Sequence, residues 1–269
     1  MTHLVFLVVI GLSSSVFSEE HPNRPSAYVE NRAYTSSLSR LSDDDKLAMR
    51  GVTWHPGCPV PLEELRNLRF AHHDAKGKIQ EGVLVVHSSV GPQWELIFGV
   101  LFSQGFVIEK AAPIRKYGGD DDKSMRNNNT SSFNCRKVTG GKGFSKHAYG
   151  VAIDVNPLWN PYVKRRGKNI KVEPEAGRVF IKRENRMGTI VADDDVVRIF
   201  RLFGFTWGGR WRSVKDYQHF EPLKKTRGES SKKSRQKTLA AWQNEKLHFK
   251  SLKLVRKKRR DAIRSGSGQ

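Results

Sequence analysis

The sequence predicts a folded domain of the α+β class. Hydrophobic residues make up 37% and aromatic residues 10% of the 269 residues, a composition typical of a folded protein. Helical and strand patterns follow one another without the regular alternation that indicates a doubly wound parallel sheet. The length leaves room for one ordinary domain with tails or for two small domains. We place the compact domain at residues 46–222.

The spacing of apolar residues predicts the elements of this domain in order. Leu62, Leu65 and Leu68 recur at helical spacing, which predicts a first helix over residues 61–68. Residues 117–143 are rich in Gly, Asn, Asp, Ser and Thr, and so long a loop within a compact domain is usually functional. Helices are further expected at residues 91–105 and 194–203, and strands at residues 82–86, 106–108, 151–155, 205–207 and 217–220.

The N-terminus has the pattern of a secretory signal. Residues 4–12 are apolar, too short a run to span a bilayer, and small residues follow before Glu19. We therefore predict a signal peptide over residues 1–18 and a secreted protein, extracellular, periplasmic or associated with a cell wall. The alternative is a buried strand. Residues 19–45 are polar and are expected to form a linker.

Most of the positive charge lies at the C-terminal end. Residues 222–269 hold 16 Lys and Arg against three acidic residues, a net +13 of the formal +21 for the chain. We predict a basic tail over residues 223–269, disordered or partly helical. It either binds an anionic polymer or a membrane surface, or is a plain solvated tail.

Two cysteines occur, Cys58 and Cys135. In an exported chain they most simply form one disulfide, which would stabilise the fold by roughly 4–5 kcal/mol in the chain-entropy model. The alternative is a pair of buried thiols. A zinc site of the cysteine type is not expected, because neither cysteine has a second one nearby in sequence.

Two histidines stand among residues suited to metal binding. His147 lies in SKHAYGVAID (residues 145–154), where Asp154 interrupts an apolar strand and is costly to bury without a partner or a metal. His219 lies in DYQHFE (residues 216–221), three residues after Asp216. Two imidazoles and one carboxylate would give Zn²⁺ three ligands and leave the fourth position to water, as in catalytic sites. The alternative is a buried ion pair that neutralises Asp154.

These stretches resemble the signatures of a family of zinc metallopeptidases. The first signature has Ser, any residue, His, then Gly, Ala and Asp at fixed steps, all filled in residues 145–154. The second, WGG followed by Trp, Asp and HFE, is complete in residues 207–221. The family comprises D-alanyl-D-alanine carboxypeptidases and L-alanyl-D-glutamate endopeptidases, which cut bacterial cell-wall peptides. Weaker likeness in GCPV, NNTS and FNCR extends the resemblance to about residues 50–222.

The resemblance implies a role for each matching residue. His147, Asp154 and His219 would hold Zn²⁺, and Asp216 would be the catalytic acid and base. The family also uses an arginine against a negatively charged oxygen, for which we choose Arg136, with Arg115 in reserve; the alternative for Arg136 is a structural ion pair. The implied fold is a small antiparallel sheet flanked by helices, similar to the Hedgehog signalling domain.

The function that follows is hydrolysis of amide bonds in the stem peptides of peptidoglycan by zinc-activated water. The first rival is a binding module for cell wall or glycan that keeps zinc without turnover. The second is a secreted basic protein whose tail provides the main activity. We expect a monomer. Whether the bond cut belongs to a carboxypeptidase or an endopeptidase substrate is left open by the residues.

Overall fold

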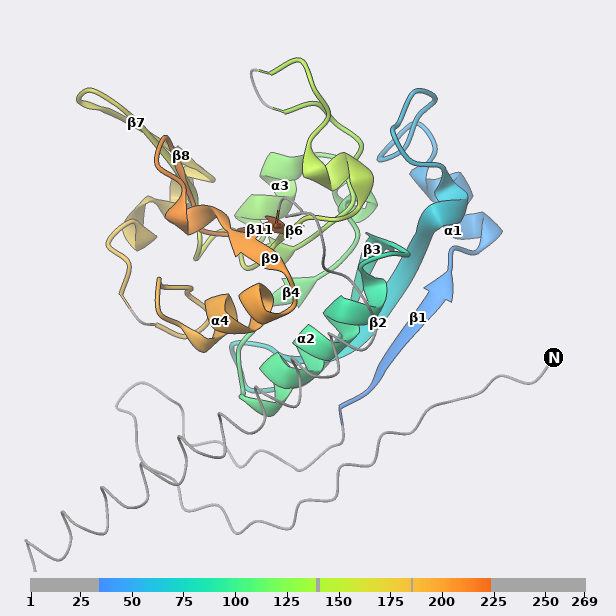
Figure 1. Ribbon diagram of the computed structural model, residues 1–269, viewed down its shortest axis with the longest axis horizontal. Coiled ribbons are helices and arrows are strands. Elements are labelled where there is room, and N and C mark those ends of the chain that lie inside the picture. The colour runs from blue at the N-terminus through green and yellow to red at the C-terminus, as the bar shows by residue number, and fades with distance from the viewer. Residues whose placement is uncertain (1–33, 139–140, 185, 224–269) are drawn as a thin grey trace, which may run out of the picture.

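The computed structural model describes residues 34–138, 141–184 and 186–223. Within them, helices of modest length combine with short, mainly antiparallel strands, which confirms the α+β class (Figure 1). The expected signal peptide and nearly all of the basic tail lie outside the described residues. No helix among the described residues has the length and apolar character needed to cross a membrane.

The largest sheet is a three-stranded meander with a helix packed on one face. Its order is β1-β2-β3, all antiparallel, and α2 lies along it (Figure 1). The rings of Phe70 in β2 and Phe98 in α2 stack with centroids 4.0 Å apart. The bounds are β1 Ser36–Arg40, α1 Asp43–Met49, β2 Leu65–His73, β3 Ile79–His87 and α2 Gly91–Ser103.

A second small sheet lies beside the first and shares its core. Its order is β6-β11-β9, and α4 covers it: Phe200 of α4 stacks on Phe220 of β11 with ring centroids 4.0 Å apart. Trp94 of α2 meets Phe205 of β9, so one apolar cluster joins both sheets. The bounds are β6 Ile153–Asp154, α4 Asp195–Leu202, β9 Phe205–Trp207 and β11 His219–Pro222.

A third sheet, of order β10-β7-β8, carries a hairpin that projects from the body of the domain (Figure 1). It is built from β7 Tyr162–Arg166, β8 Asn169–Glu173 and β10 Lys215–Asp216. The remaining strands, β4 Lys110–Ala111 and β5 Asn129–Thr130, form a parallel pair, and α3 spans Asp121–Arg126. The short 3-10 helices are η1 Leu62–Glu64, η2 Ile114–Tyr117, η3 Lys146–Tyr149, η4 Glu175–Phe180 and η5 Gly208–Arg210.

The helix predicted over residues 61–68 is wrong: only η1 forms, and β2 begins at Leu65. The spacing of the leucines indicated a helix because β2 is buried on both faces. Leu65 belongs to a cluster with Leu62 on one face, whereas Leu68 packs into the main core on the other. Residues three apart in a strand point to opposite faces, so burial of both mimics helical periodicity.

The linker predicted for residues 19–45 is wrong where the structure describes it. Residues 36–40 form β1, an edge strand whose polar side chains are mostly exposed while its backbone pairs with β2. Leu38 alone packs against the core. The predicted strand at 106–108 reduces to a single bridge between Val107 and His73, and the regular pairing starts at β4.

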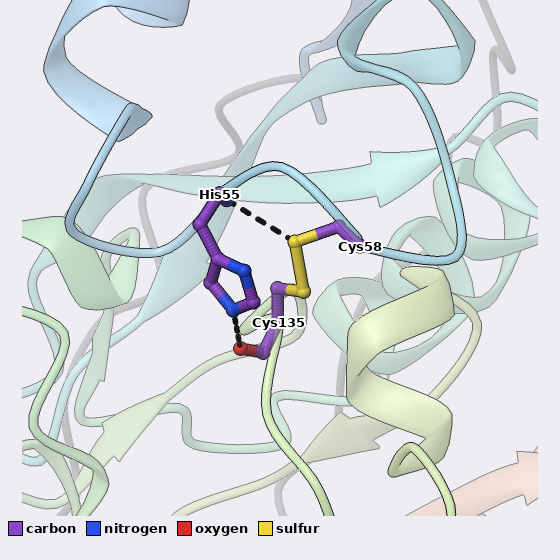
Figure 2. A group of neighbouring side chains, drawn as sticks. All are labelled: His55, Cys58 and Cys135. Carbon is purple, nitrogen blue, oxygen red and sulfur yellow. Dashed lines mark hydrogen bonds between the residues drawn. A yellow bond between two sulfur atoms is a disulfide. The ribbon is translucent and has the colours of Figure 1, made fainter.

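The predicted disulfide between Cys58 and Cys135 is present. It ties the turn that follows α1 to the segment entering the candidate site, whose Cys135 N–H also donates to Thr53 O at 2.9 Å. His55 lies against the disulfide. Its backbone N–H donates to Cys58 Sγ at 3.2 Å, and its ring Nε2 lies 3.3 Å from Cys135 O (Figure 2). Because both sulfurs are bonded to each other, this His-Cys-Cys group is not a thiolate metal site.

Candidate metal centre and active site

The three predicted metal ligands come from three different elements. His147 lies in η3, which ends at Gly150 with a positive φ of 64°. That turn leads the chain into β6, where Asp154 is the last residue. His219 begins β11 and lies directly opposite Asp154 in the antiparallel register. All three side chains are buried.

The ligand atoms of these residues converge on one point. His147 Nε2 lies 3.2 Å from His219 Nδ1 and 3.3 Å from Asp154 Oδ2. His219 Nδ1 lies 3.0 Å from Asp154 Oδ1. The convergence predicted from sequence is therefore present, although the chain separates the two histidines by 72 residues.

Each histidine has a second contact that orients its ring. His147 Nδ1 lies 2.6 Å from the carbonyl oxygen of Ser132, and His219 Nε2 lies 3.3 Å from Glu221 Oε2. Since a carbonyl and a carboxylate only accept hydrogen bonds, these nitrogens are the donors. His147 Nε2 and His219 Nδ1 are then the nitrogens that would hold a metal ion, as in protein metal sites.

The donor set and spacing fit zinc. A tetrahedral ion with bonds of about 2.0–2.1 Å to nitrogen and oxygen holds its ligand atoms roughly 3.3 Å apart. The two nitrogens lie 3.2 Å apart, and each lies 3.0–3.3 Å from one of the two Asp154 carboxylate oxygens; one ligand atom from each residue together lie within 4.8 Å of one another. Two neutral imidazoles and one carboxylate also leave one tetrahedral position for a further ligand.

The charges within the cluster suit a cation. Burial alone would raise the pKa of Asp154, yet the adjacent His147 and His219 hold that pKa well below its usual range, so the carboxylate is ionised. Burial opposes a charge on His219, but its hydrogen bonds to Asp154 and Glu221 raise its pKa to about 10. A metal ion must therefore displace a proton from His219, whereas the carboxylate of Asp154 is already ionised and able to bind a cation.

Asp216 lies beside the cluster at the end of β10. Burial raises the pKa of its carboxyl group to about 6, and the charge of Asp154 adds to the effect. Its Oδ1 is buried and has no hydrogen-bond partner among the described residues. Gly208 makes room for it: a Cβ there would lie 2.6 Å from Asp216 O and 2.8 Å from Asp216 Cβ.

The two arginines of the sequence analysis have other partners. The guanidinium of Arg136 pairs with Asp121 through Nε and donates from Nη1 to Lys137 O at 3.3 Å. Arg115 pairs with Asp45 at 2.7 Å. Among the described residues no ion pair or hydrogen bond joins either guanidinium to the metal ligands. The backbone of Arg136 is nevertheless adjacent, since its carbonyl accepts from Ser145 N at 3.0 Å.

Sequence reasoning missed Ser132 and assigned no role to Glu221. The position of Glu221 offered a signal, because side chains two residues apart in a strand share a face, which sets Glu221 beside His219. Ser132 offered none, since it acts through its backbone carbonyl. Its position follows from its neighbours: Ser131 pairs with Asp154, and Phe133 N donates to Val85 O at 3.1 Å.

A family comparison agrees with this geometry. Residues 139–222 match the sequence model of the D-alanyl-D-alanine carboxypeptidase family, a segment that contains His147, Asp154, Asp216 and His219. The match supports a peptidase, and the buried His-Asp-His cluster lies within the matched residues. Over this segment the chain is similar to the D-alanyl-D-alanine carboxypeptidase family, and the rest of the chain lies outside the match. No solved structure matches the chain.

Proposed function

We propose that the protein is a secreted, zinc-dependent peptidase that hydrolyses amide bonds in the stem peptides of peptidoglycan. The observation that carries the proposal is the juxtaposition of three converged metal-ligand atoms with Asp216. The ligands alone would suit a structural site. The neighbouring carboxylate, whose Oδ1 lacks a hydrogen-bond partner, suits a site where a proton is moved.

The chain's own residues divide the work of hydrolysis. His147, Asp154 and His219 would hold Zn²⁺, and Ser132 O and Glu221 keep the two rings in the required tautomers. Zinc bound there supplies a Lewis acid that polarises a substrate carbonyl and makes water a nucleophile near neutral pH. Asp216 accepts a proton from the attacking water and delivers it to the departing amine as the amide bond breaks.

The pKa of Asp216 suits both halves of this role. A carboxyl group with a pKa near 6 is mostly ionised at neutral pH, and once protonated it gives up the proton more readily than water does. An ordinary exposed carboxylate would be a weaker base. The partial burial of Asp216 therefore raises its pKa into a range suited to proton transfer, and Gly208 leaves the space that this buried position needs.

The main rival is a zinc-containing binding module without turnover. A buried carboxylate oxygen without a hydrogen bond destabilises the fold, and a binding module gains nothing from it. Asp216 therefore favours the enzyme. For Arg136 we retain the proposed role of steadying a substrate oxyanion or carboxylate, because its backbone adjoins the His147 motif; this role requires its guanidinium to leave Asp121 on substrate binding.

The proposal includes export by residues 1–18, a monomeric state and attachment of the basic tail to an anionic polymer or membrane surface. The tail is separable from the chemistry, since every residue of the candidate site precedes residue 222. A chain truncated after residue 223 should keep its hydrolytic activity on soluble peptides. If truncation removed activity on such peptides, the tail would be the functional part.

The decisive experiment replaces Asp216 by Asn and digests purified peptidoglycan, with products identified by mass spectrometry. Loss of the proton acceptor should lower turnover by about 10²–10⁴-fold, while zinc content stays at one ion per chain. Asp193→Asn is the matched control, because Asp193 is fully exposed and undergoes the same chemical change. The wild-type protein should release cleaved stem peptides, and a chelator should stop the release. Unchanged hydrolysis by the Asp216→Asn variant would refute the mechanism.

A further inference from the structure

The third sheet connects Asp216 to a group of cations through its strand register. Asp216 of β10 lies directly opposite Tyr162 of β7, and Lys164 of β7 lies opposite Lys171 of β8. Residues directly opposite in antiparallel strands share a face, and residues two apart along a strand share it too. One face of this sheet therefore presents, in order from the candidate base outward, Asp216, Tyr162 with Glu173, Lys164 with Lys171, and Arg166 with Asn169.

The charges near Tyr162 agree with this arrangement. Burial raises the pKa of the Tyr162 hydroxyl, the charges of Asp216 and Glu173 raise it further, and those of Lys171 and Arg166 act in the opposite sense. The hydroxyl thus lies within electrostatic reach of both the candidate base and the cations. We call Lys164, Lys171 and Arg166 the cationic face.

Charge on the cationic face is poorly balanced within the protein. Lys164 and Lys171 are a directly opposed pair of like charges, an arrangement that destabilises a hairpin. Glu173 pairs with Lys171 at 2.5 Å. No acidic group in the described part of the chain pairs with Lys164 or Arg166. A bound anion between the strands would relieve this repulsion.

The spacing indicates what kind of anion. A strand advances about 3.3 Å per residue, so Lys164 lies about 7 Å and Arg166 about 13 Å along β7 from the position opposite Asp216. An extended peptide advances at nearly the same rate. We propose that the cationic face is a substrate subsite that binds free carboxylates two to four residues from the scissile bond. This inference rests on the proposed function, and it names an acidic peptide as the substrate class.

The test uses two peptides and two double variants of the full-length, zinc-loaded protein. Both peptides are extended, contain D-alanine at the scissile bond and keep a free C-terminus; one carries two further carboxylates upstream, and in the other these are carboxamides. The test variant is Lys164→Gln with Arg166→Gln. The control is Arg165→Gln with Lys168→Gln, which removes the same charge from the opposite face and the turn of the same hairpin.

We expect the wild-type protein to prefer the acidic peptide in both kcat/KM and direct binding. Exposed ion pairs are individually weak, so the test variant should lose about three- to tenfold on the acidic peptide and nothing on the amidated one. The control variant should behave as wild type. Equal losses for both variants would show general charge attraction, as for a phosphate-rich polymer, and would overturn the subsite.

Failure of the subsite and failure of the proposed function give different results. If the wild-type protein cleaves both peptides equally and the test variant changes neither, the peptidase stands and the subsite is refuted. If no peptide is cleaved but binding of the acidic one still depends on Lys164 and Arg166, the subsite stands and the hydrolytic function is refuted. Circular dichroism of both variants verifies that the hairpin substitutions leave the fold intact.

Discussion

Glu221 provides a sharp test of how the site is oriented for metal. Its Oε2 lies 3.3 Å from His219 Nε2, and the side chain is half-buried, so Glu221→Ala removes the acceptor that holds His219 in the tautomer with Nδ1 toward the cluster. Loss of such an outer partner typically lowers metal affinity by 10–100-fold, or about 1.4–2.8 kcal/mol. Because the bond is long and partly exposed, we expect the lower end, about tenfold.

Zinc affinity is measured by competition with a chromophoric chelator at a fixed pH, without reference to turnover. Glu221→Gln keeps an acceptor oxygen and should stay within about threefold of wild type. Glu81→Ala is the matched control, an exposed glutamate paired with Arg69 in the first sheet. Wild-type zinc affinity in a folded Glu221→Ala variant would refute the idea that this carboxylate orients His219.

Three further predictions concern the base, its glycine and the disulfide. Burial raises the pKa of Asp216 to about 6, and a bound cation would lower that pKa. The value of kcat/KM should therefore fall as the pH drops through the pKa of Asp216, at or below about 6. A pH profile that is flat down to about pH 4 would exclude Asp216 as the base. Gly208→Ala places a Cβ 2.6 Å from Asp216 O and should displace β10. We expect kcat to fall about tenfold or more while zinc affinity is retained. A normal kcat would show that β10 can shift without cost to catalysis. Replacing both Cys58 and Cys135 by Ser should lower the free energy of unfolding in urea by up to roughly 4–5 kcal/mol, whereas an unchanged midpoint would contradict the chain-entropy account.

The candidate site was more predictable from sequence than the fold around it. His147, Asp154 and His219 stand in local contexts that make burial costly without a metal, and the structure brings them together. Asp216 shares the His219 motif and is therefore carried to the same place. The contact that orients the His147 ring was not predicted, because its acceptor is the backbone carbonyl of Ser132 and a backbone group has no side-chain signature.

The misassigned elements share a physical cause. β2 is buried on both faces, so it lacks the alternation that marks a strand, and its leucines imitate a helix. β1 is the reverse case, an exposed edge whose polar side chains conceal its backbone pairing. The β7–β8 hairpin was overlooked because its positive charges mask short apolar positions at Val163 and Val172. Helices α2 and α4, each with one clearly buried side, matched their predicted bounds closely.

The direct pairing of His219 with Asp154 has a consequence for divergence within such a scaffold. Backbone hydrogen bonds between β6 and β11 determine how far apart these two ligands lie, whereas their sequence separation of 65 does not. Insertions or deletions in that intervening stretch would leave the ligand geometry intact as long as α4 and β9 still pack against β11. The stretch also contains the whole β7–β8 hairpin. A scaffold built in this way can therefore exchange the proposed substrate-binding hairpin while the arrangement of its three candidate metal ligands stays constant.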